Sequence, residues 1–302
     1  MKLGISPLSW TNEAIQELGD HIPYETCISE AARAGFTGVE LGRKFPSNPE
    51  VVLSSLAEKG LVPVTGWYSG ELAERSLEDE WEAAQPAIER LKALGCTLLV
   101  YGECAAGPAD GADAALATSP PLTNLDVPVY AERVTQFADN LAELGLTLVY
   151  HHHMMQPVET VGEIDRFMSE AGASVKLLLD TGHIALSGED YTKVMNKWWD
   201  QISHIHLKDI RRDVFDNLDP STETFNDAVH KGIYTVPGDG DLDFEPVIKK
   251  IASEGYSGWL IVEAEQDPRK AQPSEVATTA FTYLAALLDK HGIPYDRNSA
   301  HG

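Results

Sequence analysis

The sequence predicts one closed (β/α)8 barrel with parallel strands. Its 302 residues exceed the length of a usual domain and suit a single barrel of this kind. Along the chain, an amphipathic helix, a glycine and a short apolar strand follow one another repeatedly, as in a parallel sheet with helical connections. Eight such strands can be counted, and eight strands can close a sheet on itself. We therefore expect a single barrel domain over residues 1–302.

The repeated unit is clearest on the two sides of Gly95. The apolar residues before it follow the spacing of one helix face: Leu77, Trp81, Ala84, Ile88 and Leu91. The apolar run 97–100 after it is typical of a buried strand. The other expected strands lie at 2–5, 39–41, 61–62, 146–149, 175–178, 202–207 and 259–262. Six helices are expected to end on a glycine with a positive φ: Gly35, Gly60, Gly95, Gly145, Gly172 and Gly255.

An open, doubly wound sheet is the main alternative, because it uses the same alternation of helix and strand. Sheets that bind dinucleotides in this way carry a Gly-x-Gly-x-x-Gly fingerprint after a strand. None of the expected strands is followed by that fingerprint, which favours the barrel.

Composition and charge exclude several classes of function. The 23 basic and 47 acidic residues give a net charge of −24, which would repel a nucleic-acid backbone. The sequence has no membrane-spanning apolar run, and Pro7 interrupts the region where a signal peptide would be apolar. Three scattered cysteines, Cys27, Cys96 and Cys104, fit a reducing compartment. We expect a cytoplasmic protein with a small-molecule partner, and a homo-oligomer is compatible with the sequence.

Two long connections follow strands, at 102–128 and 209–243. In a barrel, the connections after strands lie on the face where catalytic groups gather, so these two could cover a pocket. The alternative is that they are tolerated surface insertions. A C-terminal tail is expected from about residue 291.

The ends of the expected strands carry an unusual number of histidines and carboxylates. The residues at these ends are Glu40, Trp67, Glu103, His151 to His153, Asp180, His206 and Glu263. The last four strands would bring together His151 or His153, Asp180, His206 and Glu263, a nitrogen and oxygen set that suits Mn, Co, Fe or Zn. In a strand, His151 and His153 share a face, whereas His152 points away. Each histidine alone could instead be a hydrogen-bonded core residue, and Asp180 could cap the following helix.

The same regions resemble the xylose-isomerase-like superfamily of sugar isomerases and epimerases. The segments that carry the likeness are 35–41, 180–183, 204–209 and 259–263. Within the superfamily, the chain is most similar to members that eliminate water from 2-keto-myo-inositol during inositol breakdown. That likeness extends over nearly the whole chain and is carried by segments 3–10, 42–46, 66–68, 101–103, 151–154 and 263–268.

The resemblance implies a metal site. Its usual ligands are a Glu at the end of strand five, then Asp, His and Glu from strands six to eight, which fall on His151, Asp180, His206 and Glu263. The departure is at His151, where the superfamily has a carboxylate, and His153 could serve instead. Similar epimerases use two ligand carboxylates as paired proton carriers, so an imidazole at one position favours elimination. The resemblance also implies Mn or Co as the metal and glutathione as an aid, although no sequence feature specifies glutathione.

The expected chemistry is a dehydration that yields a trihydroxycyclohexane-1,2-dione. A divalent metal would act as Lewis acid, Glu263 as general base, and His183 or Lys208 as the acid for the leaving hydroxyl. The expected substrate-binding residues are Trp10, Glu40, Trp67, Tyr68, Glu103 and Arg212. A metal-dependent sugar or inosose isomerase or epimerase is the main alternative. An abasic-site endonuclease, which the charge disfavours, and a non-catalytic polyol-binding protein are the others.

Overall fold

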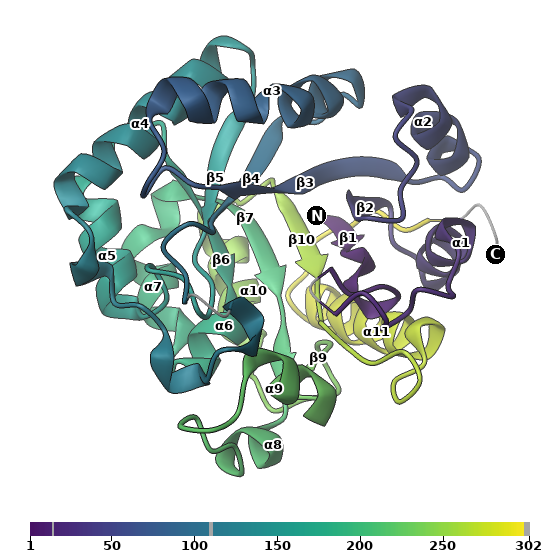
Figure 1. Ribbon diagram of the computed structural model, residues 1–302. Helices are drawn as coiled ribbons and strands as arrows, with labels where there is room; N and C mark the ends of the chain where they lie inside the picture. The colour runs from purple at the N-terminus through teal and green to yellow at the C-terminus, as the bar shows by residue number, and fades with distance from the viewer. Residues whose placement is uncertain (14, 109–110, 299–302) are drawn as a thin grey trace. The chain divides into compact units, whose positions relative to one another are not determined.

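The protein folds as a closed barrel of eight parallel strands, as the sequence predicts. The computed structural model describes residues 1–13, 15–108 and 111–298, and within them the strand order is β1-β10-β7-β6-β5-β4-β3-β2 (Figure 1). Residues 109–110 of the first long connection and 299–302 of the expected C-terminal tail lie outside the described residues.

The chain divides into two compact units. The first contains residues 1–64, 205–218 and the chain from Asn226 onward, and the second contains 65–204 and 219–225. Three of the four boundaries fall within β3 (Val62–Gly70), β7 (Ile202–Leu207) and α9 (Phe225–Lys231), and the fourth lies between α8 (Arg212–Asp216) and α9. The single domain expected from the sequence stays a prediction.

The first unit joins the two ends of the chain in one parallel sheet. Its first strand, β1 (Lys2–Ile5), pairs on one side with β2 (Gly38–Leu41) and on the other with β10 (Trp259–Val262). In turn, β10 pairs with β7, so that Ile261 lies opposite His206. The strands are short and apolar, which is typical of strands buried on both faces.

Helices from opposite ends of the chain pack side by side in this unit. Figure 1 shows α1 (Tyr24–Ala34) next to α11 (Pro273–Lys290), and the rings of Phe36 and Phe281 meet edge to face with centroids 5.3 Å apart. The other elements of the unit are η1 (Pro7–Ser9), α2 (Pro49–Ala57), β8 (Asp209–Ile210), α8 (Arg212–Asp216), β9 (Tyr234–Thr235) and α10 (Glu245–Glu254).

The second unit holds the parallel strands β3, β4, β5 and β6. Its elements are β4 (Leu98–Glu103), β5 (Thr147–His151), β6 (Lys176–Asp180), α3 (Leu77–Ala93), α4 (Val127–Glu143), α5 (Val161–Glu170), α6 (Thr181–Leu186), α7 (Tyr191–Trp198), and the short turns η2 (Gly111–Asp113), η3 (Leu116–Thr118), η4 (Leu122–Asn124) and η5 (Trp199–Gln201). Buried Val100, Val149 and Leu178 form a core cluster from three adjacent strands. Val100, Val149 and Leu178 therefore lie on one face of the sheet, and alternate residues along each of these strands share that face.

Each strand of the barrel begins within one residue of its predicted start, but several of these strands extend further than predicted. The strand expected at 61–62 runs over Val62–Gly70. Five of the six punctuating glycines have a positive φ, and Gly172 is the exception. There the helix ends at Ala171 in an extended conformation. A side chain at Gly172 would collide with Thr135, whose hydroxyl accepts the Gly172 N–H at 2.8 Å, so glycine is needed for close approach rather than for its φ.

The two long connections contain short elements of their own. The second includes α8, α9 and an antiparallel pair of β8 and β9. Within the second unit, part of each connection meets the other, because Ala115 and Thr224 form an antiparallel bridge and Leu116 N–H donates to the Glu223 carbonyl at 2.9 Å. Both connections therefore contain regular elements within the described residues.

The cysteines and the helices bear on the setting that the sequence predicts for the protein. The three cysteines are all free, with Cys27 and Cys96 buried and Cys104 exposed. Across the described ranges, none of the helices combines the length and the apolar character that crossing a bilayer requires.

Candidate metal centre and active site

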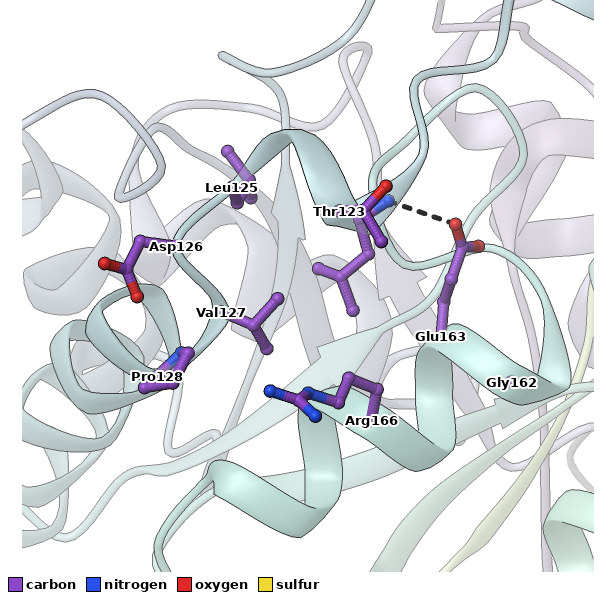
Figure 2. Close-up of a pocket in the computed structure, with 9 residues that line it drawn as sticks. Thr123, Leu125, Asp126, Val127, Pro128, Gly162, Glu163 and Arg166 are labelled. Atoms are coloured by element: carbon purple, nitrogen blue, oxygen red, sulfur yellow. Dashed lines mark hydrogen bonds between the residues drawn. The ribbon is translucent and has the colours of Figure 1, made fainter.

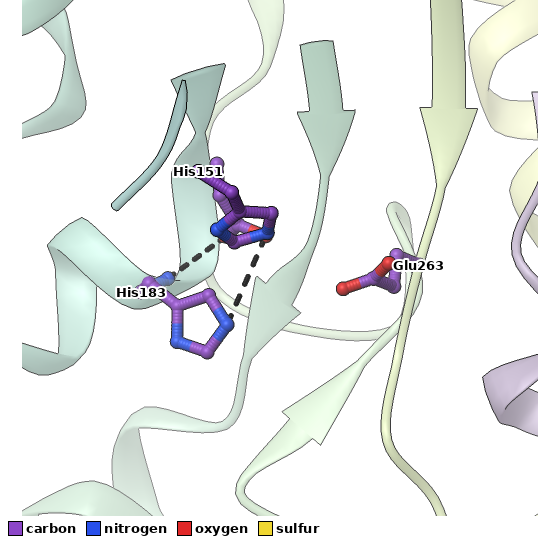
Figure 3. A group of neighbouring side chains, drawn as sticks. His151, His183 and Glu263 are labelled. Carbon is purple, nitrogen blue, oxygen red and sulfur yellow. Dashed lines mark hydrogen bonds and ion pairs between the residues drawn. The ribbon is translucent and has the colours of Figure 1, made fainter. Parts of the chain in front are cut away.

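Three buried side chains meet at the ends of β5 and β6 in the second unit. The Nε2 atom of His151 lies 3.7 Å from Oδ2 of Asp180, and Nε2 of His183 lies 4.0 Å from the same oxygen. Figure 3 shows the His151 and His183 rings next to each other, and each of the three residues offers a ligand atom within 4.8 Å of the other two. Imidazole and carboxylate donors at this spacing suit a divalent cation.

Asp180 both caps a helix and faces His151. Its Oδ1 accepts the backbone N–H groups of Gly182 and His183, each at 2.9 Å, at the start of α6. The cap uses Oδ1, and Oδ2 is the oxygen on the side of the histidines. The capping role expected from the sequence therefore uses a different oxygen from the one that faces the histidines.

Backbone contacts set the orientation of the neighbouring histidines. The Nδ1–H of His151 donates to the His152 carbonyl at 2.6 Å, so Nε2 carries the lone pair that a cation needs. His152 is turned the other way, and its Nε2 accepts the Asp180 N–H at 3.2 Å. This is the alternation expected for consecutive residues at the end of a strand.

His153 lies in a cluster of rings. Its ring centroid is 3.8 Å from that of His183, 5.7 Å from that of Phe225 and 6.0 Å from that of Trp67. Its Nδ1–H donates to the Met154 carbonyl at 2.6 Å. Phe225 belongs to the second long connection, so that connection reaches a candidate site residue.

Trp67 is the exposed aromatic residue at this site. Its side chain is 43% exposed, and its ring centroid lies 5.4 Å from that of His151. The indole N–H donates to the Ser69 hydroxyl at 2.9 Å. The ring lies over Gly102, where any side chain would overlap it. An exposed aromatic face next to polar groups is typical of a site that binds a ring compound.

In the first unit, His206 is held between two carboxylates. Its Nδ1 lies 3.1 Å from Oε2 of Glu263, and its Nε2 lies 3.1 Å from Oε1 of Glu40. All three residues are buried. A separation of 3.1 Å fits two neighbouring ligands of one cation when each metal bond is about 2.1 Å long. Glu40 then orients the ring, as carboxylates behind ligand histidines commonly do.

Lys208 and Glu265 complete this group. Lys208 is fully buried, and its Nζ lies 2.7 Å from Oε1 of Glu263 and 2.9 Å from Oε2 of Glu265. Glu265 was not among the site residues predicted from the sequence. Its position two residues after Glu263, on the same face of an extended segment, could have indicated it.

Two of the residues expected to line the pocket make hydrogen bonds and packing contacts within the protein. The indole of buried Trp10 donates to Glu30 at 2.6 Å. The Tyr68 hydroxyl donates to Glu80 at 2.6 Å, and its ring stacks on Phe137 of α4. Tyr68 follows Trp67 directly, so the two side chains leave the strand on opposite faces. Burial also raises the pKa of Tyr68, with the hydrogen-bonded Glu80 as a second cause.

Glu103 forms hydrogen bonds with the backbone of two neighbouring loops, at Ala73 and Ala105. It is fully buried, and its two oxygens accept the N–H groups of Ala73 and Ala105 at 3.0 and 2.9 Å. The Tyr101 hydroxyl donates to it as well, at 2.9 Å. Burial raises the pKa of Glu103 in spite of these donors. Glu103 and Tyr101 are two residues apart on β4, so their side chains lie on the same face of the strand. Gly102, over which the Trp67 ring lies, faces the opposite side.

Arg212, at the start of α8, is exposed. Its guanidinium lies 5.7 Å from the ring centroid of Phe215, and its backbone N–H donates to Asp241 at 2.7 Å. These contacts belong to the second long connection itself. They do not by themselves assign a substrate contact to Arg212.

A cavity of about 540 Å³ lies in the second unit, between the first turns of α4 and α5 (Figure 2). Its lining is Leu122, Thr123, Leu125, Asp126, Val127, Pro128, Gly162, Glu163 and Arg166. Glu163 closes the capping box of α5 by accepting the Thr160 N–H at 2.9 Å, and it also accepts the Leu122 N–H at 3.1 Å. None of the expected site residues is among them, so this cavity has no part in the predicted chemistry.

A smaller cavity of about 230 Å³ in the first unit has several basic residues in its wall. Lys270 donates to the His230 carbonyl and Arg211 to the Gly232 carbonyl, both at 2.7 Å. These carbonyls lie at the end of α9. The positive charges therefore stabilise a helix C-terminus, which explains them without a ligand.

The fold and these side chains define a class of protein: a (β/α)8 barrel whose strand ends carry buried donors for a divalent cation. The sequence model of the family described as xylose isomerase-like TIM barrel matches residues 28–287, and the chain belongs to that family. This confirms the resemblance inferred from the sequence.

Relatives of known name extend over nearly the whole chain. The chain is 40% identical over 292 residues to the "Rhizopine catabolism protein MocC" of Rhizobium meliloti, covering 97% of this chain and 90% of the relative. It is 39% identical over 286 residues to the "Inosose dehydratase" of Geobacillus thermodenitrificans, covering 94% and 96%. A solved structure described as an IOLI protein with a bound zinc atom superposes with a TM-score of 0.71 at 14% identity, covering 96% and 99%, which shows a shared fold.

Proposed function

We propose that this protein is a metal-dependent inosose dehydratase, which removes water from 2-keto-myo-inositol to give a trihydroxycyclohexane-1,2-dione. Identity of 39% to a relative of that name, over 94% of the chain, supports the substrate class. The observation that carries the chemistry is the pairing of a histidine with a carboxylate at neighbouring strand ends within each unit, His151 with Asp180 and His206 with Glu263. Each pair has the donors and the spacing that a divalent cation requires.

The proposed ligands are His151, Asp180, His206 and Glu263. They end or follow β5, β6, β7 and β10, which are consecutive in the barrel. Between the two candidate histidines, the contact of His151 with Asp180 favours His151, while His153 lies among rings. The mixed nitrogen and oxygen donors suit Mn or Co, which we propose as the metal.

Elimination needs a base for the α-proton and an acid for the hydroxyl that leaves. When bound, a divalent cation would polarise the substrate ketone and stabilise the negative charge that develops on its oxygen. Glu263 takes the α-proton on Oε1, the oxygen that faces Lys208 rather than His206. The electrons of the C–H bond form a C=C bond as the β-hydroxyl leaves, and the resulting enol tautomerises to the 1,2-dione.

His183 is the proposed acid. It gives a proton to the β-hydroxyl as the C–O bond breaks, and this hydroxyl leaves as water. One proton then returns from Glu263 to His183 through solvent, so both residues end the cycle as they began. Lys208, the other candidate acid, already has three carboxylate oxygens within 3.1 Å, which favours His183.

Trp67 is the proposed platform for the carbon ring of the substrate, because it is the exposed aromatic residue beside His151. Glu40 acts through His206, whose ring it holds. Trp10, Tyr68 and Glu103 support the walls through their buried hydrogen bonds. Arg212 is proposed to bind substrate oxygens from the second long connection.

We further infer a cytoplasmic setting, no nucleic-acid partner and a possible role for glutathione. The net charge of −24 and the free cysteines support the first two inferences. We also propose that the protein associates into a homo-oligomer.

The decisive experiment is incubation of the protein with 2-keto-myo-inositol and Mn²⁺ or Co²⁺, followed by mass spectrometry. We expect a product that has lost one water, and no product after chelation of the metal. A product of unchanged formula would indicate an isomerase or epimerase instead. Binding without any conversion would indicate a polyol-binding protein, and either result would refute the proposal.

Replacement of the base tests the assignment within the site. Glu263→Gln should lower kcat by about 100-fold or more, the usual contribution of a general base. Glu254→Gln, at an exposed carboxylate that pairs with Lys250, is the matched control and should retain full activity. A folded Glu263→Gln protein with a near wild-type rate would rule out Glu263 as base.

A further inference from the structure

A buried lysine joins two carboxylates in the first unit. Besides Oε1 of Glu263 at 2.7 Å, the Nζ atom of Lys208 has both oxygens of Glu265 within reach, at 2.9 and 3.1 Å. Its charge also lies over the ring of Tyr234, 4.7 Å from the centroid. Three carboxylate oxygens thus face an ammonium group that has three protons to donate.

These contacts give the two oxygens of Glu263 different surroundings. Oε1 faces Lys208, whereas Oε2 lies 3.1 Å from Nδ1 of His206, whose Nε2 is held by Glu40. Acidic and basic groups therefore alternate along one line from Glu40 to Glu265. His206 lies between Glu40 and Glu263, and Lys208 lies between Glu263 and Glu265.

We propose that Lys208 and Glu265 form a clamp that keeps Oε1 of Glu263 off the bound cation, so that Glu263 ligates through Oε2 alone. The clamp rests on the metal-dependent function proposed above. Lys208 holds Oε1, and Glu265 holds Lys208 by placing both of its oxygens on Nζ. Both are positioning residues, because they act through Glu263.

The clamp has a consequence for coordination. A carboxylate can bind a cation through one oxygen or through two. A second bond from Glu263 would occupy a position that water or a substrate oxygen otherwise takes. It would also remove Oε1 as the acceptor of the substrate proton. By competing for Oε1, Lys208 keeps both the open position and the base.

Two variants separate the clamp from the charge of the group. Glu263, Lys208 and Glu265 together carry a formal charge of −1, which Lys208→Met changes to −2. Combining Lys208→Met with Glu265→Gln restores −1 but still lacks the clamp, so the overall charge is preserved while the positioning is lost. The matched control is Lys249→Met, at a lysine that is 62% exposed and pairs with Glu245 on the same helix.

The measurement uses Mn²⁺ alone as the probe. Affinity and stoichiometry come from a titration followed by electron paramagnetic resonance, and the number of water ligands comes from water-proton relaxation. For the double variant we expect one water ligand fewer than in the wild type. We also expect a kcat for dehydration that is about 10- to 100-fold lower, as for other losses of groups behind a metal ligand. Glu265→Gln alone should give a smaller change in the same direction.

A folded double variant that keeps the wild-type number of water ligands would overturn the clamp. An unchanged water count and kcat in Glu265→Gln would overturn the part assigned to Glu265. Circular dichroism checks folding, and the double variant decides the question if Lys208→Met alone is unfolded. Failure of the wild type to bind Mn²⁺ or to dehydrate the substrate would refute the proposed function instead, so the two failures are distinguishable.

Discussion

Gly102→Ala tests whether Trp67 is the platform for the substrate. A methyl group on Gly102 would lie only 2.0 Å from Cη2 of the Trp67 indole. Ordinary contact begins at 3.4 Å, so the ring has to move by about 1.4 Å. Because Trp67 is 43% exposed, it can swing outward, away from His151, at little cost in stability.

A displacement of this size should damage binding more than folding. Misplacement of a substrate by about 1 Å can cost about 100-fold in rate, so we expect kcat/KM for 2-keto-myo-inositol to fall by about 10- to 100-fold. The melting temperature should change little. Steady-state kinetics and thermal unfolding of the same preparation measure the two effects.

Two further variants test the assignment of Trp67 as the platform. Trp67→Phe removes the ring atoms that collide, so adding Gly102→Ala to it should cause little further loss. In Gly70→Ala, the new methyl meets the ring of Tyr101, which is fully buried and cannot swing away. That variant should lose about 1–3 kcal/mol of unfolding free energy. Gly102→Ala with wild-type kinetics, or with a loss of stability like that of Gly70→Ala, would refute the assignment of Trp67.

Three further predictions concern the cation and pH. Glu40→Gln should weaken Mn²⁺ binding by about 10-fold or more because His206 loses the carboxylate that orients it, and unchanged affinity in a competition titration would contradict this. His151→Asn should weaken Mn²⁺ binding by at least about 10-fold, whereas His153→Asn should leave the affinity within about 2-fold; the reverse order would make His153 the ligand. Burial raises the pKa of Asp209 to about 6, from 3.8, so its carboxylate is harder to ionise in the folded protein. Relative to Asp209→Asn, the wild type should therefore lose up to about 3 kcal/mol of stability as pH rises from about 4 to 6, and a difference in denaturant unfolding that does not vary with pH would contradict it.

The sequence was most informative about the backbone. The starts of the barrel strands were predicted within one residue because each is a local run of apolar residues, and a glycine precedes six of the eight. Local patterns are less informative about why a glycine is needed. Gly172 punctuates the sequence like the others, yet its role depends on Thr135 in a helix far back along the chain.

The parity of residues along a strand explains which expected site residues lie elsewhere. Trp67 and Tyr68 were both assigned to the pocket, although neighbours on a strand leave it on opposite faces. Tyr68 packs on Phe137, and Glu103 binds the backbone of two loops. Position at a strand end was therefore necessary for a site residue but not sufficient.

By itself, the sequence determined the barrel and the ligand-type residues at its strand ends, because hydrophobic periodicity and residue chemistry are local properties. Only the tertiary structure decided which atoms face one another. It paired Glu40 with His206 across more than 160 residues of chain and placed Lys208 between Glu263 and Glu265. Such pairings arise when distant strands become neighbours, and the pattern within any one strand carries no information about them.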